Sequence, residues 1–279
     1  MLKVLKSGFY TTVQDEGRFG LRDKGVPVSG AMDTQSLIRA NSLLENPADA
    51  AGLEITMTGP TLVFEEPTHI CLGGAALSAT LNNEPIENYK VYRITAGDIL
   101  SYGRLEKGFR GYLAVKGGLL GEKILGSRSQ YAPLTKSKCI ADQTEIDYGP
   151  STDFEPKITE LKAKSNFSAD GLQVQPGPEY GLLDAAQLEK LYNDVFTISK
   201  ENNRMAYQLN ETIGPHTMSM LTSATLPGTV QLTPSGKIII LMKDGQTTGG
   251  YPRILQLSEE AICLLAQKKF GDAIRFVHS

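Results

Sequence analysis

The sequence predicts a mainly β fold with a few short helices, arranged as barrels or sandwiches. Short apolar runs bounded by turn residues recur along the whole chain. Helical patterns are few and short, and similar motifs recur about 170 residues apart. Together these patterns favour two β-rich units over one large domain.

Six apolar runs carry the strand prediction, because each is short, rich in β-branched or aromatic residues, and bounded by turn residues. They are Thr61–Phe64, His69–Leu72, Ile99–Tyr102, Tyr112–Val115, Thr229–Leu232 and Ile238–Met242. Asn82 and Asn83 lie between two further short runs and predict a hairpin turn. Pro234-Ser235-Gly236 predicts a second hairpin.

Three segments predict helices. Residues 32–44 place Leu37, Ala40, Leu43 and Leu44 on one face, with Asp33 or Ser29 as the cap and Asn46-Pro47 after the end. Residues 184–192 form the second, with Leu188 and Leu191 directed inward. The third begins at Ser258 and runs to about Lys268.

The domain organisation follows from the repeat and from one polar segment. Residues 2–8 resemble 172–177, 70–75 resemble 240–245, and 97–102 resemble 271–276. Chance recurrence of Gly-Asp turns is the alternative. The polar stretch 150–170 predicts a linker, in which residues 158–164 fit a surface helix. We therefore expect domains at 1–165 and 166–279, with exchange of strands across the boundary open.

Composition excludes several classes of function. The chain has 279 residues, 41% hydrophobic and 21% charged, with a net charge of −3, and its basic residues are scattered, so nucleic acid is not an expected partner. No segment reads as a signal peptide or membrane span, so we expect a soluble, cytoplasmic protein without membrane contact. The three cysteines and three histidines lack metal or disulfide spacing. No P-loop, GxGxxG or GxSxG occurs either.

Two segments in the first domain are candidates for chemistry. Val13–Arg18 sets two carboxylates beside an arginine, which suits binding of a polar substrate but also an exposed turn with a salt bridge. Gly25–Asp33 leads into a predicted helix, where free backbone N–H groups bind an oxyanion or Ser29 or Asp33 simply caps the helix.

Two more candidates follow later in the chain. Asp244–Pro252 joins paired glycines to two hydroxyls, an amide and a phenol after an apolar strand. Such a loop offers neutral hydrogen bonds to an amide or ureido group, although a plain β-turn is the alternative. Leu125–Ser129 holds an arginine between two serines, which fits an anion site or an ordinary loop.

These segments resemble a known family of proteins. The matching stretches, in order, are VQDEGR (13–18), GVPVSGAMD (25–33), LEITMTGPTL (53–62), ALSATL (76–81), YLAVKGG (112–118), LGSRS (125–129), NRM (203–205), PGTVQ (227–231) and DGQTTGGYP (244–252). The family contains the C subunits of bacterial 5-oxoprolinases, the KipI antagonist KipA, allophanate hydrolase subunit 2 and part of the urea amidolyase carboxyltransferase domain. The resemblance spans nearly the whole chain.

The resemblance implies two cyclophilin-like β-barrel domains and a multi-subunit enzyme. It implies two partners, a B subunit that is KipI-like and an A subunit that is LamB/YcsF-like. The complex opens a lactam, 5-oxoproline, to L-glutamate with ATP. Because this chain has no nucleotide motif, ATP is expected to act through the complex and not through this chain alone.

On that basis we expect the loops to line one shared pocket. Asp15 is predicted as a polarising or proton-accepting carboxylate, with Arg18 positioning it or a substrate carboxylate. An anion is expected at Arg128 and the Ser29-Gly30 backbone. Amide recognition is predicted for Gln246, Thr247, Thr248 and Tyr251, with Tyr251 also placed among the catalytic residues. Gly249 and Gly250 are predicted to bind substrate beside them.

Two alternative functions stay open. One is the carboxyltransferase component of a biotin-dependent urea or amide carboxylase, which binds a ureido ring by neutral hydrogen bonds. The other is a non-catalytic, KipA-like antagonist that binds a KipI-like partner. The chain departs from the family pattern at Ala76, Ala206 and Thr222–Ala224, and these departures keep the second alternative open.

Overall fold

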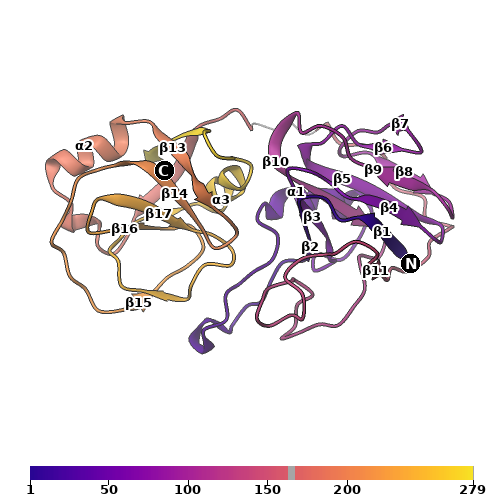
Figure 1. Ribbon diagram of the computed structural model, residues 1–279, viewed down its shortest axis with the longest axis horizontal. Helices are drawn as coiled ribbons and strands as arrows, with labels where there is room; N and C mark the ends of the chain where they lie inside the picture. Colours follow the sequence, from indigo (N-terminus) through magenta and orange to yellow (C-terminus); the bar gives the residue numbers. More distant parts are fainter. Residues whose placement is uncertain (163–166, 279) are drawn as a thin grey trace. The chain divides into compact units, whose positions relative to one another are not determined.

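The computed structural model describes residues 1–162 and 167–278, and it is mainly β, as predicted (Figure 1). Within these residues, three α-helices and two short 3₁₀ helices accompany the strands. The chain forms two compact units, one of Met1–Arg18 and Ser29–Ser165, the other of Phe19–Val28 and Asn166–Ser279. Residues 19–28 therefore pack with the second unit although they lie early in the sequence. The division into domains at 1–165 and 166–279 stays a prediction.

The first unit contains two sheets around one core. The six-stranded sheet has the order β11 (Glu145–Ile146), β1 (Leu2–Lys6), β4 (Thr61–Phe64), β9 (Ile99–Ser101), β6 (Thr80–Leu81) and β7 (Glu84–Pro85). The five-stranded sheet has the order β2 (Tyr10–Gln14), β3 (Gly52–Thr56), β10 (Lys107–Val115), β5 (Thr68–Ala76) and β8 (Val91–Ile94). Side chains from both sheets, such as Leu62 and Leu113, belong to one buried cluster.

Helix α1 (Thr34–Leu43) covers the other face of the five-stranded sheet, which explains why β5 and β10 are buried on both sides. Ala40, Leu43 and Leu44 pack there against Cys71 and Ala114. Cys71 is fully buried in this cluster, and burial raises the pKa of its thiol to about 12, as is typical of a core cysteine. The predicted helix is confirmed, with Asp33 as its cap at 3.0 Å from the Ser36 N–H.

The second unit is a closed barrel of seven strands. Its order is β12 (Gly171–Pro176), β19 (Arg253–Leu257), β16 (Thr229–Leu232), β17 (Lys237–Leu241), β14 (Ala206–Thr212), β13 (Phe196–Asn202) and β20 (Ala273–His278). Closure leaves the barrel no free sheet edge. A separate two-stranded ribbon joins β15 (Ser223–Ala224) to β18 (Thr248–Gly249).

The predicted hairpins and helices are found. Asn82 and Asn83 join β6 to β7 with the positive φ angles, 51° and 68°, that a type I′ turn needs. Pro234–Gly236 lies between β16 and β17. Helices α2 (Ala185–Asn193) and α3 (Glu259–Ala266) begin after the caps Asp184 and Ser258.

The predicted surface helix and the predicted internal repeat do not agree fully with the structure. The predicted surface helix over 158–164 is wrong for residues 158–162, because Glu160 bridges to Lys90 and the segment runs alongside β8. Residues 163 and 164 lie outside the described residues. The repeated motifs all fall on or beside strands, but β12 pairs with β20 whereas β1 reaches β9 only through β4. The two units therefore do not share one pairing scheme for these motifs.

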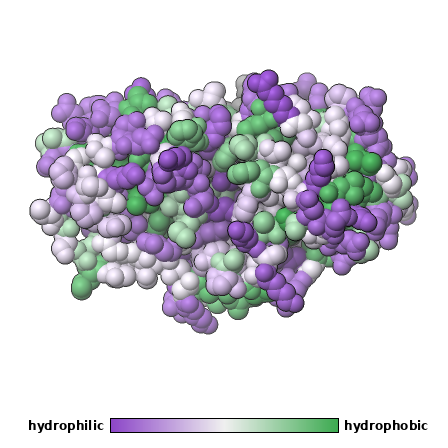
Figure 2. Space-filling model, in the orientation of Figure 1, coloured by the Kyte–Doolittle hydropathy of each residue, from purple (hydrophilic) through white to green (hydrophobic). Residues whose placement is uncertain are grey.

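The surface is of mixed polarity. On the face drawn in Figure 2, hydrophobic side chains occur in small groups among hydrophilic ones. Scattered exposed apolar side chains are usual on folded proteins. Among residues 1–162 and 167–278, no helix has the length and apolar character needed to cross a membrane.

The capping box of α2 gives a test of local stability. Asp184 accepts from the Gln187 N–H at 2.8 Å, and Gln187 accepts from the Asp184 N–H at 3.1 Å. We expect Asp184→Ala to lower the free energy of unfolding by about 1 kcal/mol, measured by urea titration. Glu189→Ala on the exposed face of the same helix is the control and should change it by less than about 0.5 kcal/mol. Equal effects of the two substitutions would contradict the capping role.

Candidate functional site

In the first unit, Asp15 lies at the end of β2 and is only 3% exposed. The hydroxyls of Ser127 and Ser129 each donate to its Oδ1 at 2.6 Å, and the Gly17 N–H donates to the same oxygen at 2.9 Å. The Arg128 N–H donates to Oδ2 at 2.6 Å. Four donors therefore converge on one buried carboxylate, which we call the Asp15 cradle.

Arg18 is 1% exposed and binds the same loop, residues 124–129. Its Nε donates to the Ile124 carbonyl at 3.0 Å, and its Nη2 donates to the Ser129 carbonyl at 2.7 Å. These bonds fix the backbone of 124–129 and so fix the serines that bind Asp15. Arg128 presents its backbone to the cradle, while its side-chain Nε donates to the Gly121 carbonyl at 3.2 Å.

The Ser29-Gly30 turn folds against this cradle. Ser29 has φ 57° and Gly30 has φ 76°, and a Cβ on Gly30 would lie 2.6 Å from the Glu16 carbonyl oxygen. Only glycine fits so close an approach with this backbone. The Ala31 N–H donates to the Asp15 carbonyl at 2.9 Å, which closes the turn. The Ser29 hydroxyl is buried without a hydrogen-bond partner among the described residues.

A buried polar network that the sequence analysis missed holds the start of α1. Glu54 on β3 accepts from the Met32 N–H at 2.7 Å and from the Tyr112 hydroxyl at 2.9 Å. Tyr112 in turn accepts from the Asp33 N–H at 2.8 Å. Burial, followed by the nearby Glu54 charge, raises the pKa of Tyr112 well above its usual value, so it stays a neutral donor. The sequence feature that could have predicted this network is Glu54, the one charged residue in the strand Gly52–Thr56. A buried carboxylate needs hydrogen-bond partners.

In the second unit, arginine–carboxylate pairs fix both ends of the loop 244–252. Arg204 binds Asp244 through two hydrogen bonds of 2.9 and 3.0 Å. Arg253 binds Glu179 through two bonds of 3.0 and 2.8 Å, and its Nη1 donates to the Ala224 carbonyl at 2.7 Å. Such forked pairs set direction as well as distance.

Between these anchors, the loop shows its side chains to solvent. Gln246, Thr248 and Gly250 are exposed, Tyr251 is 41% exposed and Thr247 is half-buried. The side chains of Gln246, Thr247, Thr248 and Tyr251 have no hydrogen bond to another part of the chain that the structure describes. Gly249 is buried, and a Cβ there would lie only 2.5 Å from Gln231 Nε2, so a larger residue would not fit without a shift. The exposed groups are neutral donors and acceptors, as an amide-binding loop requires.

The predicted residues thus fall into two groups, and the single shared pocket stays a prediction. Asp15, Arg18, Ser29, Gly30 and Arg128 come together in the first unit. The group of residues 246–251 lies in the second unit, beside β15. That strand contains Ser223 and Ala224, where the chain departs from the family pattern, so the departure adjoins the candidate site.

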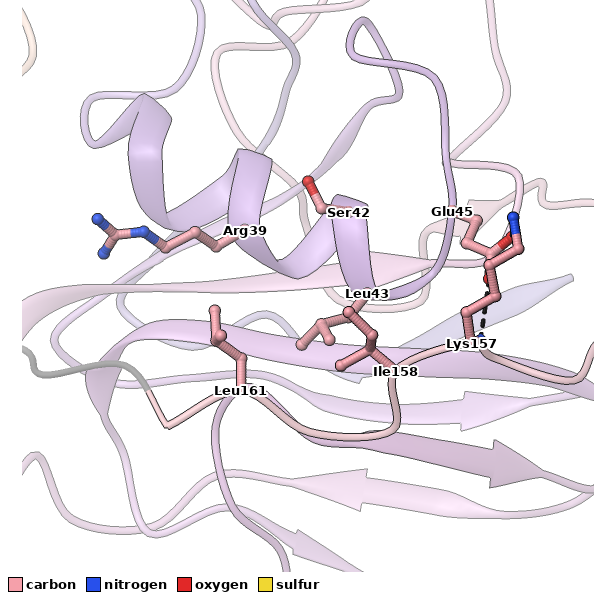
Figure 3. A pocket seen from close by; sticks show the side chains of 7 residues that line it. All are labelled: Arg39, Ser42, Leu43, Glu45, Lys157, Ile158 and Leu161. Atoms are coloured by element: carbon pink, nitrogen blue, oxygen red, sulfur yellow. Dashed lines mark hydrogen bonds and ion pairs between the residues drawn. The ribbon is translucent and has the colours of Figure 1, made fainter.

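A separate cavity of about 450 Å³ opens in the first unit (Figure 3). Its apolar lining comes from Leu43, Ile158 and Leu161. The ion pair between Lys157 and Glu45 lies at one side of the cavity. It contains none of the predicted site residues. In the described parts of the chain, no three His, Cys, Asp or Glu side chains are grouped as a metal would require.

The cradle predicts the effect of neutralising Asp15. In Asp15→Asn, an NH₂ group faces hydroxyl and N–H donors, which leaves buried donors without an acceptor. We expect a loss of about 2–4 kcal/mol in the free energy of unfolding, measured by urea titration. Glu16→Gln, the same chemical change at the neighbouring half-buried carboxylate, should cost less than about 0.5 kcal/mol. A loss below about 1 kcal/mol for Asp15→Asn would contradict the cradle.

The Glu179–Arg253 pair predicts a pH dependence. The hydrogen bonds from Arg253 hold the pKa of Glu179 below its usual value. The pair's contribution is therefore complete above the unfolded-state pKa of about 4.3 and is lost as the pH falls through the lower folded-state pKa. We expect the difference in unfolding free energy between wild type and Glu179→Gln to shrink from about pH 6 to about pH 3. An equal difference at both values would refute the coupling.

The chain matches a family model over residues 24–278, that of the carboxyltransferase domain, subdomain A and B. It is 35% identical to the 5-oxoprolinase C subunit of Escherichia coli, covering 99% of this chain and 91% of that protein. It is 32% identical to the Haemophilus influenzae protein of the same name, covering 99% and 90%. The solved structure of Kluyveromyces lactis urea amidolyase superposes with a TM-score of 0.84 at 27% identity, covering 99% of this chain and 18% of that one. This chain belongs to the carboxyltransferase domain family.

Proposed function

We propose that this protein is the C subunit of an ATP-dependent 5-oxoprolinase, which opens 5-oxoproline to L-glutamate together with partner subunits. One observation carries the proposal: the loop 246–251 presents unpaired, neutral hydrogen-bonding groups from a rigidly anchored backbone. The relatives named as C subunits of 5-oxoprolinase, matched over nearly their whole length, support the choice of substrate.

The substrate explains why neutral groups are needed. 5-Oxoproline contains a lactam, whose carbonyl accepts and whose N–H donates hydrogen bonds. The amide of Gln246 and the hydroxyls of Thr247, Thr248 and Tyr251 offer both kinds of partner. A site built to hydrogen-bond an amide discriminates strongly against analogues that lack it.

The substrate carboxylate requires a different partner. Arg128 and the backbone at Ser29-Gly30, next to the start of α1, are the groups of the first unit that suit an anion. Asp15 and Arg18 are buried beneath them and hold the loops in place. Their hydrogen bonds favour this organising role over direct proton transfer, and the catalytic roles predicted for Asp15, Arg18 and Tyr251 stay predictions.

The lactam is an unstrained amide, so its opening needs activation, which ATP supplies by phosphorylation or a comparable step. We propose that ATP binds to the partner subunits. The B subunit is a KipI-like protein, and the A subunit is a LamB/YcsF-like protein. A cytoplasmic complex of the three is part of the proposal.

A biotin-dependent carboxyltransferase is the second candidate. The match to the carboxyltransferase family and the likeness to urea amidolyase favour it. A ureido ring takes the same neutral hydrogen bonds as a lactam, so residues 246–248 fit biotin as well. Biotin, when carboxylated, would supply the carboxyl group. Turnover with carboxybiotin and urea, and none with 5-oxoproline, would favour this candidate.

Thr248 provides the test of amide recognition. We expect Thr248→Val to lower kcat/KM for 5-oxoproline by about 3–10-fold in the complex reconstituted with its partner subunits, since one hydrogen bond contributes about 0.5–1.5 kcal/mol. Thr212→Val, an exposed position on β14, is the matched control and should have no effect. Unchanged kcat/KM for Thr248→Val would contradict the role of Thr248 in amide recognition.

A non-catalytic, KipA-like function predicts a different result. A stoichiometric complex with the KipI-like partner that shows no turnover would favour this alternative.

A further inference from the structure

Residues 19–28 form an excursion whose two ends are fixed in the first unit. Arg18 is held before it by its bonds to Ile124 and Ser129, and Gly30 is held after it against Glu16. The excursion itself packs with the second unit. Its turn is a short 3₁₀ helix, η1 (Arg22–Lys24), closed by Gly25 in the left-handed region at φ 78°.

Arg22 reaches the backbone of the candidate amide-binding loop. Its Nη2 donates to the Thr225 carbonyl and, at 3.5 Å, to the Gln246 carbonyl. Thr225 is itself bound to the same loop: its hydroxyl donates to the Gln246 carbonyl at 2.5 Å, and its N–H donates to the Thr247 carbonyl at 3.0 Å. One guanidinium therefore joins the two segments that continue into β15 and β18.

The charge of Arg22 is not explained by an ion pair. No carboxylate lies within ion-pair distance of it among the described residues, and its Nη1 is buried without a hydrogen-bond partner there. Burial lowers the pKa of Arg22. A guanidinium that is partly desolvated and bound only to carbonyls costs stability compared with a solvated one. In the structure its Nη2 donates to the carbonyls of two loop segments, Thr225 and Gln246.

We propose that Arg22 is a positioning residue, which holds the backbone of Gln246 and Thr247 so that their side chains face the substrate. The proposal rests on the proposed amide-binding role of residues 246–251 and extends it to a residue from the far end of the sequence. Arg22 then acts as the third anchor of the loop, between the Arg204–Asp244 and Arg253–Glu179 pairs.

The first measurement needs no enzymatic activity. Hydrogen exchange of the Thr225 amide, which donates to Thr247, reports whether the two segments stay joined. We expect Arg22→Met to speed this exchange about tenfold, because a hydrogen bond to a charged donor is lost. Arg22→Lys should restore part of the protection. Lys24→Met, on the same exposed turn, is the control and should leave exchange unchanged. Unchanged exchange in Arg22→Met would overturn the proposal.

The second measurement separates positioning from folding. In the reconstituted complex, we expect Arg22→Met to lower kcat/KM for 5-oxoproline about tenfold, mainly by raising KM, because the substrate-reading side chains are displaced. Partial unfolding would reduce the amount of active protein and lower the apparent kcat at unchanged KM. That pattern, or unchanged kinetics despite faster exchange, would overturn the positioning role. If the wild-type complex lacks turnover, the proposed function fails, and the exchange measurement alone decides whether Arg22 anchors the loop.

Discussion

Backbone polar groups in irregular segments must find partners when they are buried, and in this chain buried charged side chains provide them. In the first unit one carboxylate, Asp15, accepts from four donors on two loops that are distant in sequence. In the second unit the charged side chains are donors: arginines donate hydrogen bonds to carbonyls and carboxylates around residues 244–252. Beside backbone hydrogen bonds, these loops use a few acidic and basic side chains as partners. Those side chains help to fix the geometry of both candidate groups.

This arrangement separates the residues that hold the loops from those that are free to bind. Asp15 and Arg18 are almost fully buried, and their hydrogen bonds serve the protein itself. Gln246, Thr248 and Tyr251 are exposed on a backbone that is fixed at both ends. Preorganised groups of this kind lose little freedom when a ligand binds, which raises both affinity and specificity. The neutral character of the exposed set matches a lactam or a ureido ring better than a charged group.

Two of the three departures from the family pattern, those at Ala206 and Thr222–Ala224, lie in the second unit with this set. Ser223 and Ala224 form β15, which pairs directly with Thr248 and Gly249. A changed side chain on β15 therefore lies beside the exposed threonine. Ala206 starts β14 next to Arg204, which anchors Asp244.

Local sequence determined most of the secondary structure. The runs at 61–64 and 229–232 became strands with unchanged bounds, and Asp33, Asp184 and Ser258 cap their helices, because capping and alternation depend on neighbours a few residues away. The helix expected at 158–164 failed for its described part because pairing with the β8 region outweighed a weak local preference. The motifs also marked both candidate loops in advance.

Only the tertiary structure decided which distant residues meet. Ser129 binds Asp15 across 114 positions, and Arg22 binds Thr225 across 203. No periodicity or motif encodes such pairs, since they depend on how strands are ordered in space and on which unit a crossing segment joins. The sequence by itself determined the elements, the candidate loops and the resemblance to the family. Folding determined that Asp15 is buried and saturated with donors while Thr248 is exposed, because burial and hydrogen bonding depend on the whole surrounding structure.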